Sequence, residues 1–210
     1  MTMNRAIPMP TRRSLLLVLT CVTATAGARD AHADAASAAT DFISQLMQKL
    51  ASVVNSDQPN GQKQAALEQL VDTSVDVPEV ARFCLGRFWR IATQAQQEQY
   101  VDVFHRTLVN SVAGKVGEYR GVSYTIGRAS PRDDTIVVPT TVTRPSNAPS
   151  KVEWIVSTAS GAPKIVDLIA EGVSLRITQR SDYASYLARN NNSVQSLIDA
   201  LRRQANNPQG

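Results

Sequence analysis

The sequence predicts an α+β domain in which N-terminal helices pack on a curved antiparallel sheet and a C-terminal helix ends the fold. Three observations support this fold class: apolar residues recur at helical spacing from residue 36 to 119, β-branched runs follow from residue 122, and a capped amphipathic segment starts at residue 193. Of the 210 residues, 43% are hydrophobic and 19% are charged, which fits a single globular domain and excludes a chain that is disordered throughout.

The first 33 residues are typical of an export signal. Arg12 and Arg13 precede the apolar run 15–28, and Ala31-His32-Ala33 provides small residues at the spacing that signal peptidase requires. We therefore expect a periplasmic domain over residues 34–205, followed by a frayed tail at 206–210. Because the arginine pair also fits a twin-arginine signal, the export route is either Sec or twin-arginine.

Charge and composition argue against several classes of function. Removal of the predicted signal lowers the formal net charge from +4 to +1, since four arginines and one aspartate leave with it. No run of Lys or Arg remains, which argues against a nucleic-acid partner and an electrostatic membrane anchor. Cys84 and His105 are then the one cysteine and the one histidine, so we expect a buried thiol, no internal disulfide, no metal and no cofactor.

Four helices are predicted before residue 122. The first covers residues 36–55, and the second is centred on residues 67–71. The third runs from an N-cap at Asp76 to an exit at Gly86, and the fourth begins at the capping-box sequence 93–96. The fourth helix continues for more than five turns, with an apolar stripe formed by Tyr100, Val103, Phe104, Leu108, Val112, Val116 and Tyr119.

Strands are predicted for the following part of the chain. The β-branched runs, separated by turn residues, are Val122–Ile126, Thr135–Val142, Lys151–Ser157 and Pro163–Ala170. They predict an antiparallel meander, which residues 173–178 are expected to prolong. Ser193 then caps the final helix.

Two carboxylates are the best candidates for acid–base chemistry. A strand carboxylate such as Asp167 that faces into the domain is a plausible catalytic group. The structural interpretation is favoured: Asp167 pairs with an arginine such as Arg90 or Arg180, and Glu171 with its following glycine shapes a turn. His105 is likewise expected to be solvated or hydrogen-bonded rather than catalytic.

The strands have apolar residues on both faces. Val152, Trp154 and Val156 alternate with Ile155, whereas a sheet with one solvated face would alternate apolar with polar residues. Either helices cover both faces, or one face lines an internal hydrophobic cavity. The periodicity does not separate these two alternatives.

Two motifs resemble those of a known family. Segment Asp76–Arg90 (DVPEVARFCLGRFWR) is similar to the helix signature of the Mla/toluene-tolerance (MlaC-like) family of periplasmic lipid-binding proteins. Segment Val166–Leu175 (VDLIAEGVSL), with Arg180 downstream, resembles that family's D-x-x-x-E-G-V-S motif. The resemblance extends over residues 36–203. The chain departs from the family at Pro163, where relatives often carry Trp, and at Trp154, where they often carry Tyr.

The resemblance implies a soluble lipid carrier and no enzymatic activity. Such a carrier shields lipid tails in a hydrophobic pocket and moves them between membranes. The expected ligand is a phospholipid, with a hopanoid as the alternative if the chain belongs to the hopanoid-biosynthesis-associated (HpnM-like) subgroup. The expected partners are an inner-membrane ABC-type transport complex and an outer-membrane lipoprotein or porin-associated acceptor, and the protein is expected to be a monomer.

Apolar residues on elements that must face one another are the candidate lipid contacts. They are Leu85, Phe88, Trp89, Phe104, Leu108, Val112, Tyr124, Val138, Val152, Trp154, Ile165 and Leu168. Taken one at a time, ordinary core is the favoured interpretation of each of them over lipid contact. A rival function is a small-molecule isomerase or dehydratase on an α+β cone, with Asp167, His105 and Tyr124 as the acid–base set.

Overall fold

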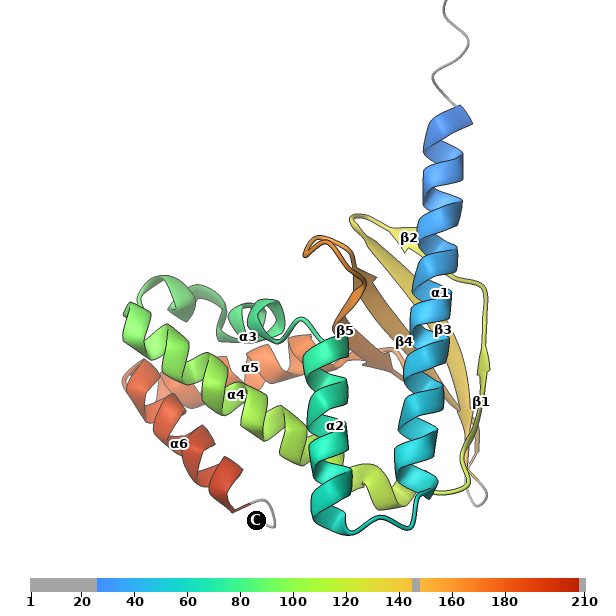
Figure 1. Ribbon diagram of the computed structural model, residues 1–210. Helices are drawn as coiled ribbons and strands as arrows, with labels where there is room; N and C mark the ends of the chain where they lie inside the picture. Colours follow the sequence, from blue (N-terminus) through green and yellow to red (C-terminus); the bar gives the residue numbers. More distant parts are fainter. Residues whose placement is uncertain (1–25, 145–147, 208–210) are drawn as a thin grey trace, which may run out of the picture. The chain divides into compact units, whose positions relative to one another are not determined.

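The computed structural model describes residues 26–144 and 148–207 (Figure 1). Contacts divide the chain into two compact units, Met1–Asp34 and Ala35–Gly210, and the fold described below is that of the second unit. The predicted export signal falls largely on residues 1–25, which lie outside the described residues, as do the last three residues of the predicted tail. No helix of the described part is both long and apolar enough to cross a membrane.

Helices precede and follow the sheet. The four predicted N-terminal helices are α1 (Ala26–Asn55), α2 (Asn60–Ser74), α3 (Val77–Leu85) and α4 (Gln94–Lys115), with short 3₁₀ segments η1 (Gly86–Arg90) and η2 (Val116–Tyr119). The predicted C-terminal helix is α6 (Val194–Asn206). These helices are confirmed.

Local capping interactions explain where the helices begin. The Asp76 carboxylate accepts a hydrogen bond from the backbone N–H of Glu79 at 3.2 Å, and Gly86 ends α3 with a φ of 59°. A complete capping box joins Thr93 and Gln96: each side chain accepts from the other residue's backbone N–H, at 3.2 and 3.1 Å. The sequence-based helix starts are therefore confirmed.

Helix α5 (Leu175–Arg189) was not predicted from the sequence. The prediction that residues 173–178 prolong the sheet is wrong beyond the two-residue strand β6 (Val173–Ser174). Ser174 caps α5 by accepting from Ile177 N at 3.1 Å. Residues 173–178 alternate apolar with polar side chains, as a half-buried strand would, but α5 buries only Tyr183 and Leu187.

Within the described residues, six strands form one antiparallel sheet. The order is β1-β3-β4-β5-β6, with β2 also pairing with β3. The remaining strands are β1 (Ser123–Ile126), β2 (Ser130–Arg132), β3 (Thr135–Thr143), β4 (Ser150–Ser157) and β5 (Lys164–Ala170). The meander is confirmed. The short strand β2 was not predicted, since Pro131 and Arg132 carry no strand signal.

One face of the sheet packs against residues 35–47 of α1, which belong to the second unit. The sheet core joins buried residues of α1 and of three strands: Ala39, Ile43, Leu46, Met47, Ile136, Val138, Val156 and Ile165. On the opposite face, the cluster found among the described residues consists of strand residues alone, Val137, Ile155, Val166 and Ile169. Apolar residues thus lie on both faces of the sheet, and α1 covers one of these faces.

The helices form a second core. It joins residues of α3, η1, α4, α5 and α6, with Tyr100, Phe104 and Tyr183 in mutual aromatic contact at centroid distances of 5.9 to 6.5 Å. The stripe predicted for α4 is correct in its first half. It is wrong at Tyr119, which is 38% exposed on η2, and it omits Val109, which is buried. The α-helical period ends at Lys115, so Tyr119 no longer falls on the stripe.

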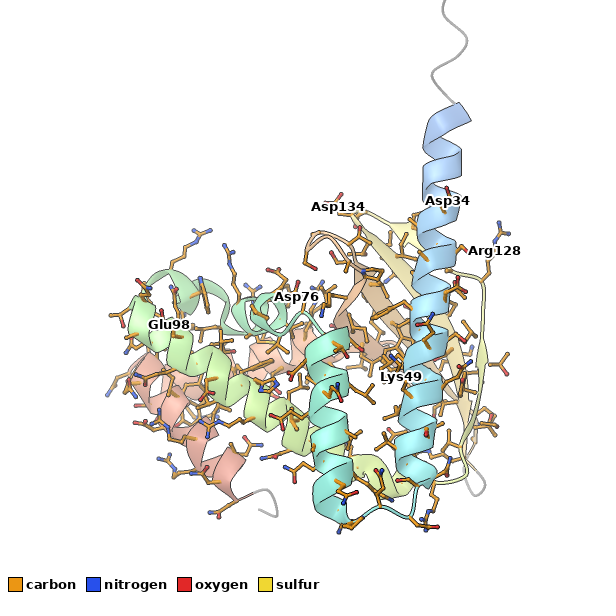
Figure 2. All side chains as sticks on the ribbon, in the orientation of Figure 1. Asp34, Lys49, Asp76, Glu98, Arg128 and Asp134 are labelled. Carbon is orange, nitrogen blue, oxygen red and sulfur yellow. The ribbon has the colours of Figure 1, made fainter. Side chains whose placement is uncertain are left out.

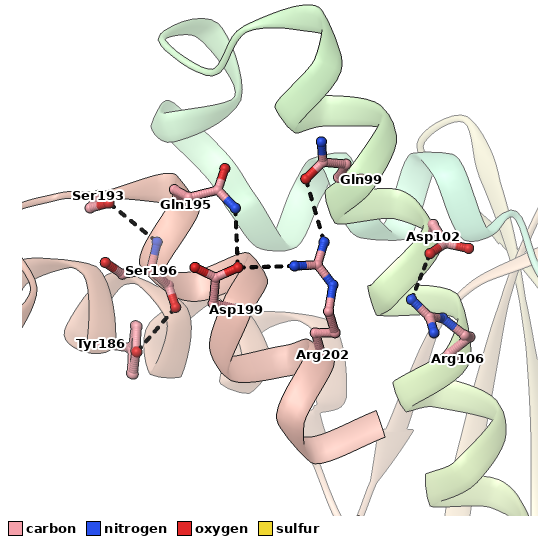
Figure 3. A network of polar contacts seen from close by, with 9 residues as sticks. All are labelled: Gln99, Asp102, Arg106, Tyr186, Ser193, Gln195, Ser196, Asp199 and Arg202. Atoms are coloured by element: carbon pink, nitrogen blue, oxygen red, sulfur yellow. Dashed lines mark hydrogen bonds and ion pairs between the residues drawn. The ribbon is translucent and has the colours of Figure 1, made fainter. Parts of the chain in front are cut away.

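Polar contacts fix α6 against α4 (Figure 3). Asp199 accepts hydrogen bonds from Gln195 and Arg202 on the same helix, at 3.1 and 3.0 Å. Arg202 also donates to Gln99 of α4 at 3.4 Å, and Ser193 caps the helix by accepting from Ser196 N at 3.2 Å. The final helix is therefore held on the helical core by its apolar stripe and by this network.

The two cores meet at the edge of β5. Val75, between α2 and α3, forms a parallel bridge with Ile165, and Asp76 N donates to Ile165 O at 3.0 Å. The Lys164 ammonium group donates to the last carbonyls of α2, those of Asp72 and Thr73, at 3.0 and 2.8 Å. The helix pair α2–α3 is thus tied to the sheet by main-chain and charged contacts.

Candidate functional site

A wide groove lies where α2, α3, η1 and α4 meet. We call it the apolar groove. Its volume is about 1020 Å³, and its residues are Asp72, Val75, Val77, Pro78, Trp89, Gln94, Gln97, Glu98, Val101, Asp102 and His105. Its apolar lining residues are Val75, Val77, Pro78, Trp89 and Val101, and all of its polar lining residues except Asp72 lie on α4. A concave site that combines apolar side chains with polar groups is typical of small-molecule sites.

Local structure holds Trp89 in the wall of the apolar groove. The η1 turn that carries Trp89 ends at Arg90, and the Thr93–Gln96 capping box starts α4 shortly after it. The Gln97 side-chain amide donates to the Trp89 carbonyl at 2.8 Å, so α4 is fastened directly to η1. The Gln97 side chain therefore fixes the backbone at Trp89.

Three acidic residues line the apolar groove. They are Asp72, Glu98 and Asp102, and Glu98 projects from the first turns of α4 in Figure 2. His105 also lines this groove, and its Nε2 lies 2.6 Å from the Asp72 carboxylate. The prediction that His105 is hydrogen-bonded is confirmed by this contact.

A second groove, which shares Trp89 with the first, is lined by residues of α3, η1 and α5. We call it the arginine groove. Its volume is about 600 Å³, and it is lined by Glu79, Arg82, Phe83, Gly86, Arg87, Trp89, Arg90 and Arg180. Charge counting along the sequence does not reveal this groove, because Arg180 joins the other three arginines from a distant segment of the chain.

The predicted lipid contacts divide between the two cores. Leu85, Phe88, Trp89, Phe104, Leu108 and Val112 belong to the helical core or pack against it, whereas Tyr124, Val138, Trp154 and Ile165 belong to the sheet core. Val152 and Leu168 are half-buried on the strands β4 and β5. Of the twelve, Trp89 lines the apolar groove. The groove residues Val75, Val77, Pro78 and Val101 were missed because they lie at helix ends or off the main stripe of α4.

The strand residues of this set are close to one another. In the sheet register, Trp154 lies opposite both Val138 and Leu168, and Val152 lies opposite Thr140. The Trp154 indole N–H donates to the hydroxyl group of Thr140, which is itself buried, at 3.1 Å. The structure therefore brings these predicted contacts together on the face that packs against α1.

Asp167 is a structural carboxylate. It is buried, and it accepts hydrogen bonds from Leu168 N at 2.8 Å, Arg176 N at 3.1 Å and the Ser174 hydroxyl group at 2.6 Å. Its charge is paired with Arg176 at 3.4 Å, so the predicted pairing with Arg90 or Arg180 is wrong although an arginine is the partner. The sequence did not suggest Arg176 because α5 was not foreseen.

The turn predicted at Glu171 is confirmed. Glu171 and Gly172 have φ values of 49° and 81°, and they connect β5 to β6. The Glu171 carboxylate accepts from Lys151 N at 2.5 Å, which fastens the turn to β4. Both family-motif carboxylates therefore have structural partners.

The three residues of the rival acid–base set have separate surroundings. Asp167 accepts from Arg176 N in the first turn of α5, His105 contacts Asp72 beside the apolar groove, and Tyr124 packs against the sheet core. Cys84 is buried in the helical core, where burial and the nearby Asp167 charge raise its thiol pKa to about 12.

In the part of the chain that the structure describes, no three His, Cys, Asp or Glu side chains are grouped to hold a metal ion.

Comparison with known proteins identifies a family and a similar solved structure. The family model of the MlaC protein matches residues 42–203, a range that contains both grooves and most of the sheet core. The chain belongs to the MlaC family. Its fold is also similar to the solved structure of a phospholipid-binding protein from Ralstonia solanacearum in complex with a phospholipid, with a TM-score of 0.71 and 22% sequence identity over 82% of this chain and 99% of that one.

The MlaC-family motifs coincide with the grooves. Segment Asp76–Arg90 forms α3 and η1, which supply one wall of each groove. Segment Val166–Leu175 forms β5, the Glu171 turn and the start of α5, which carries Arg180. The motif residues recognised in the sequence are thus those that place Trp89 and the arginines.

Proposed function

We propose that this MlaC-family protein is a phospholipid carrier and not an enzyme, and that it shields acyl chains in the apolar groove. The observation that carries the proposal is a groove of about 1020 Å³ with Val75, Val77, Trp89 and Val101 in its walls, in a chain of a family whose fold holds a phospholipid in a solved relative. The volume lies at the upper end of the usual range for ligand sites.

Acyl burial supplies enough free energy for such a site. Removing about 15 methylenes from water contributes roughly 12 kcal/mol at about 0.8 kcal/mol per methylene, before the cost of ordering the chain and the protein. Binding therefore depends mainly on the tails. Headgroup contacts then decide which lipid is preferred.

The carrier role places the protein between two membranes. We propose that it is exported, accepts a lipid from an inner-membrane ABC-type complex and delivers it to an outer-membrane acceptor. A phospholipid is the preferred cargo, since the solved relative holds one. A hopanoid remains the alternative cargo for the hopanoid-associated subgroup.

Native mass spectrometry tests the proposed cargo. Protein purified from its native host should carry a phospholipid, which lipid extraction then identifies. A dominant hopanoid signal would replace the phospholipid assignment. Absence of any bound lipid, together with no uptake from extracted lipids, would contradict the carrier function.

A pair of variants tests the position of the tails. Val101→Asp places a carboxylate in the wall of the apolar groove and should abolish lipid uptake. Val173→Asp is the matched control, because Val173 is 55% exposed and lies outside both grooves. Equal uptake by the two folded variants would show that the tails lie elsewhere.

Exchange measurements test the proposed partners. Lipid transfer to vesicles that contain the inner-membrane complex should be faster than transfer to protein-free vesicles. Equal rates would argue that no docking to that complex is needed.

A further inference from the structure

The arginine groove concentrates positive charge that the protein itself does not neutralise. Arg82, Arg87, Arg90 and Arg180 line it, and Glu79 is the one acidic residue among its lining residues. Among the described residues, none of these four guanidinium groups lies within 4.0 Å of a carboxylate, whereas six other arginines have such a partner. A cluster of this kind leaves its N–H donors free for an anion.

Two of the four guanidinium groups, those of Arg87 and Arg180, contact aromatic rings, and Arg180 also lies against a glycine. Arg180 stacks on the Phe83 ring at 5.1 Å, and Arg87 lies over Phe88 at 4.9 Å. Gly86 has a φ of 59°, and a Cβ atom there would lie 3.0 Å from Nε of Arg180. Because residue 86 is a glycine, the backbone at the end of α3 can lie directly against Arg180. This close contact limits the positions that the Arg180 guanidinium can take.

Among the described residues, Arg176, next to Arg180 on the Phe83 ring, differs from Arg180 in having a carboxylate partner. Arg176 also stacks on the Phe83 ring, at 4.3 Å, but its charge is paired with Asp167. Arg180 shares the ring and, within the part of the chain described, has no such carboxylate. The Phe83 ring therefore holds one neutralised and one unpaired guanidinium.

Trp89 lines both grooves, so the two are adjacent. The lining of the apolar groove includes Asp72, Glu98 and Asp102, of which Asp102 is paired with Arg106 at 2.7 Å and Asp72 contacts His105. Four arginines and one glutamate line the arginine groove, so an anion is favoured there over the apolar groove. An amphiphile with an anionic head and apolar tails would therefore lie across Trp89 in one orientation. Its tails would occupy the apolar groove and its charged group the arginine groove.

We infer that the arginine groove binds the phosphate group of the lipid, with Arg82, Arg87, Arg90 and Arg180 as its ligands. This inference rests on the proposed carrier function and adds the position of the headgroup. Arginine suits this role because its planar donor fork matches phosphate oxygens and its charge persists at any physiological pH. The site then distinguishes phospholipids from apolar lipids with the same tails.

A competition between two lipids tests the inference. The full chain is incubated with equal amounts of dioleoylphosphatidylglycerol and dioleoylglycerol, which share their tails and differ in the phosphate-bearing headgroup, and native mass spectrometry gives the bound ratio. The wild-type protein should prefer the phospholipid. In a triple variant with Arg82, Arg87 and Arg90 each changed to Gln, the bound ratio of phospholipid to dioleoylglycerol should fall at least about tenfold, because charge-assisted hydrogen bonds to the phosphate are lost.

A matched control separates local from bulk charge. Arg128, Arg189 and Arg203 lie outside both grooves and have no carboxylate within 4.0 Å among the described residues; Arg128 projects outward in Figure 2. Changing these three to Gln removes the same charge and should leave the preference unchanged. Uptake of dioleoylglycerol offered alone should be the same in the wild-type protein and in both triple variants.

The outcomes separate the inference from the proposed function. If wild-type protein takes up neither lipid, the carrier function fails. If it takes up both and the two triple variants behave alike, the headgroup site is overturned while the carrier function stands. Calorimetric titration with inorganic phosphate gives a further arm: if the groove variant loses phosphate binding but keeps its lipid preference, the groove is a site for free phosphate and the headgroup assignment is overturned.

Discussion

The Ser174 hydroxyl group donates a hydrogen bond of 2.6 Å to the buried Asp167 carboxylate and accepts one of 3.1 Å from the backbone N–H of Ile177. Through these two bonds the last central strand, β5, holds the first turn of α5. Asp167 also accepts from Arg176 N, so the same carboxylate contacts both the cap and the first turn of this helix. The orientation of α5, and hence the position of Arg180 in the arginine groove, depends on this contact.

Asp167→Ala should destabilise the fold by about 2–4 kcal/mol, because it leaves the Ser174 hydroxyl, two backbone N–H groups and the Arg176 charge without their acceptor. Urea unfolding followed by circular dichroism measures the loss. Glu153→Ala is the control: it removes a half-exposed partner of Arg132 and should cost at most about 1 kcal/mol. Equal losses in the two variants would contradict the structural role of Asp167.

Much of the fold could be predicted from the sequence because capping boxes and apolar periodicity are local signals. Asp76, Thr93, Gln96 and Ser193 all act at helix starts as their spacing predicted. Helix α5 was missed because its apolar residues are few and partly exposed: Leu175 and Ile177 are 49% and 60% exposed. Ser174 caps the helix locally, but the Ser174 hydroxyl and Arg176 N are both bound by Asp167 of strand β5, a contact for which the sequence holds no local signal.

The candidate site was less predictable. Trp89 could be identified from the family motif, but the division of the apolar residues into a helical core and a sheet core depends on how α2 and α3 meet β5 through Val75 and Ile165. The arginine groove depends on the packing of α5 against α3, which places Arg180 over Gly86. Neither the division into two cores nor the arginine groove produces a periodic pattern or a characteristic residue spacing in the sequence.

Gly86→Ala should cost about 1–2 kcal/mol, because a left-handed backbone is unfavourable for a residue with a Cβ and that atom would meet Arg180 at 3.0 Å. The same variant should weaken the preference for phosphatidylglycerol over diacylglycerol if Arg180 is displaced. Gly61→Ala is the control, since Gly61 lies in α2 where an added Cβ would have no atom within 4 Å, and it should stabilise by up to about 1 kcal/mol. Thermal unfolding of both variants checks the opposite signs.

The two tryptophans should respond differently to truncation. Trp154 packs against the sheet core and donates to Thr140, so Trp154→Ala should cost about 2–4 kcal/mol while bound phospholipid is retained. Trp89 lines both grooves, so Trp89→Ala should lower phospholipid uptake. Differential scanning calorimetry and native mass spectrometry on the same samples measure the two effects. Selective loss of lipid in Trp154→Ala at unchanged stability would instead place the tails on the sheet face.

Burial in the helical core should make the protein sensitive to alkali. Burial raises the pKa of Cys84 to about 12 from an ordinary value of 9.0, and it also raises the pKa values of Tyr100 and Tyr183 above 10.0. These groups stay neutral in the folded protein while the unfolded chain ionises them. Their contribution to stability is therefore complete below about pH 9 and is lost as the pH rises, by about 1.4 kcal/mol per pH unit for each group that has passed its unfolded pKa.

Tyr183→Phe provides the sharpest test of this linkage, because it removes one titrating group and keeps the ring that contacts Tyr100 and Phe104. Between about pH 10.5 and about pH 11.5, above the ordinary tyrosine pKa of about 10, the free energy of unfolding should fall less steeply in the variant than in the wild-type protein. The expected difference in slope is about 1.4 kcal/mol per pH unit, measured by urea unfolding at each pH. Parallel pH profiles would show that the Tyr183 hydroxyl group ionises as readily in the folded protein as in the unfolded chain.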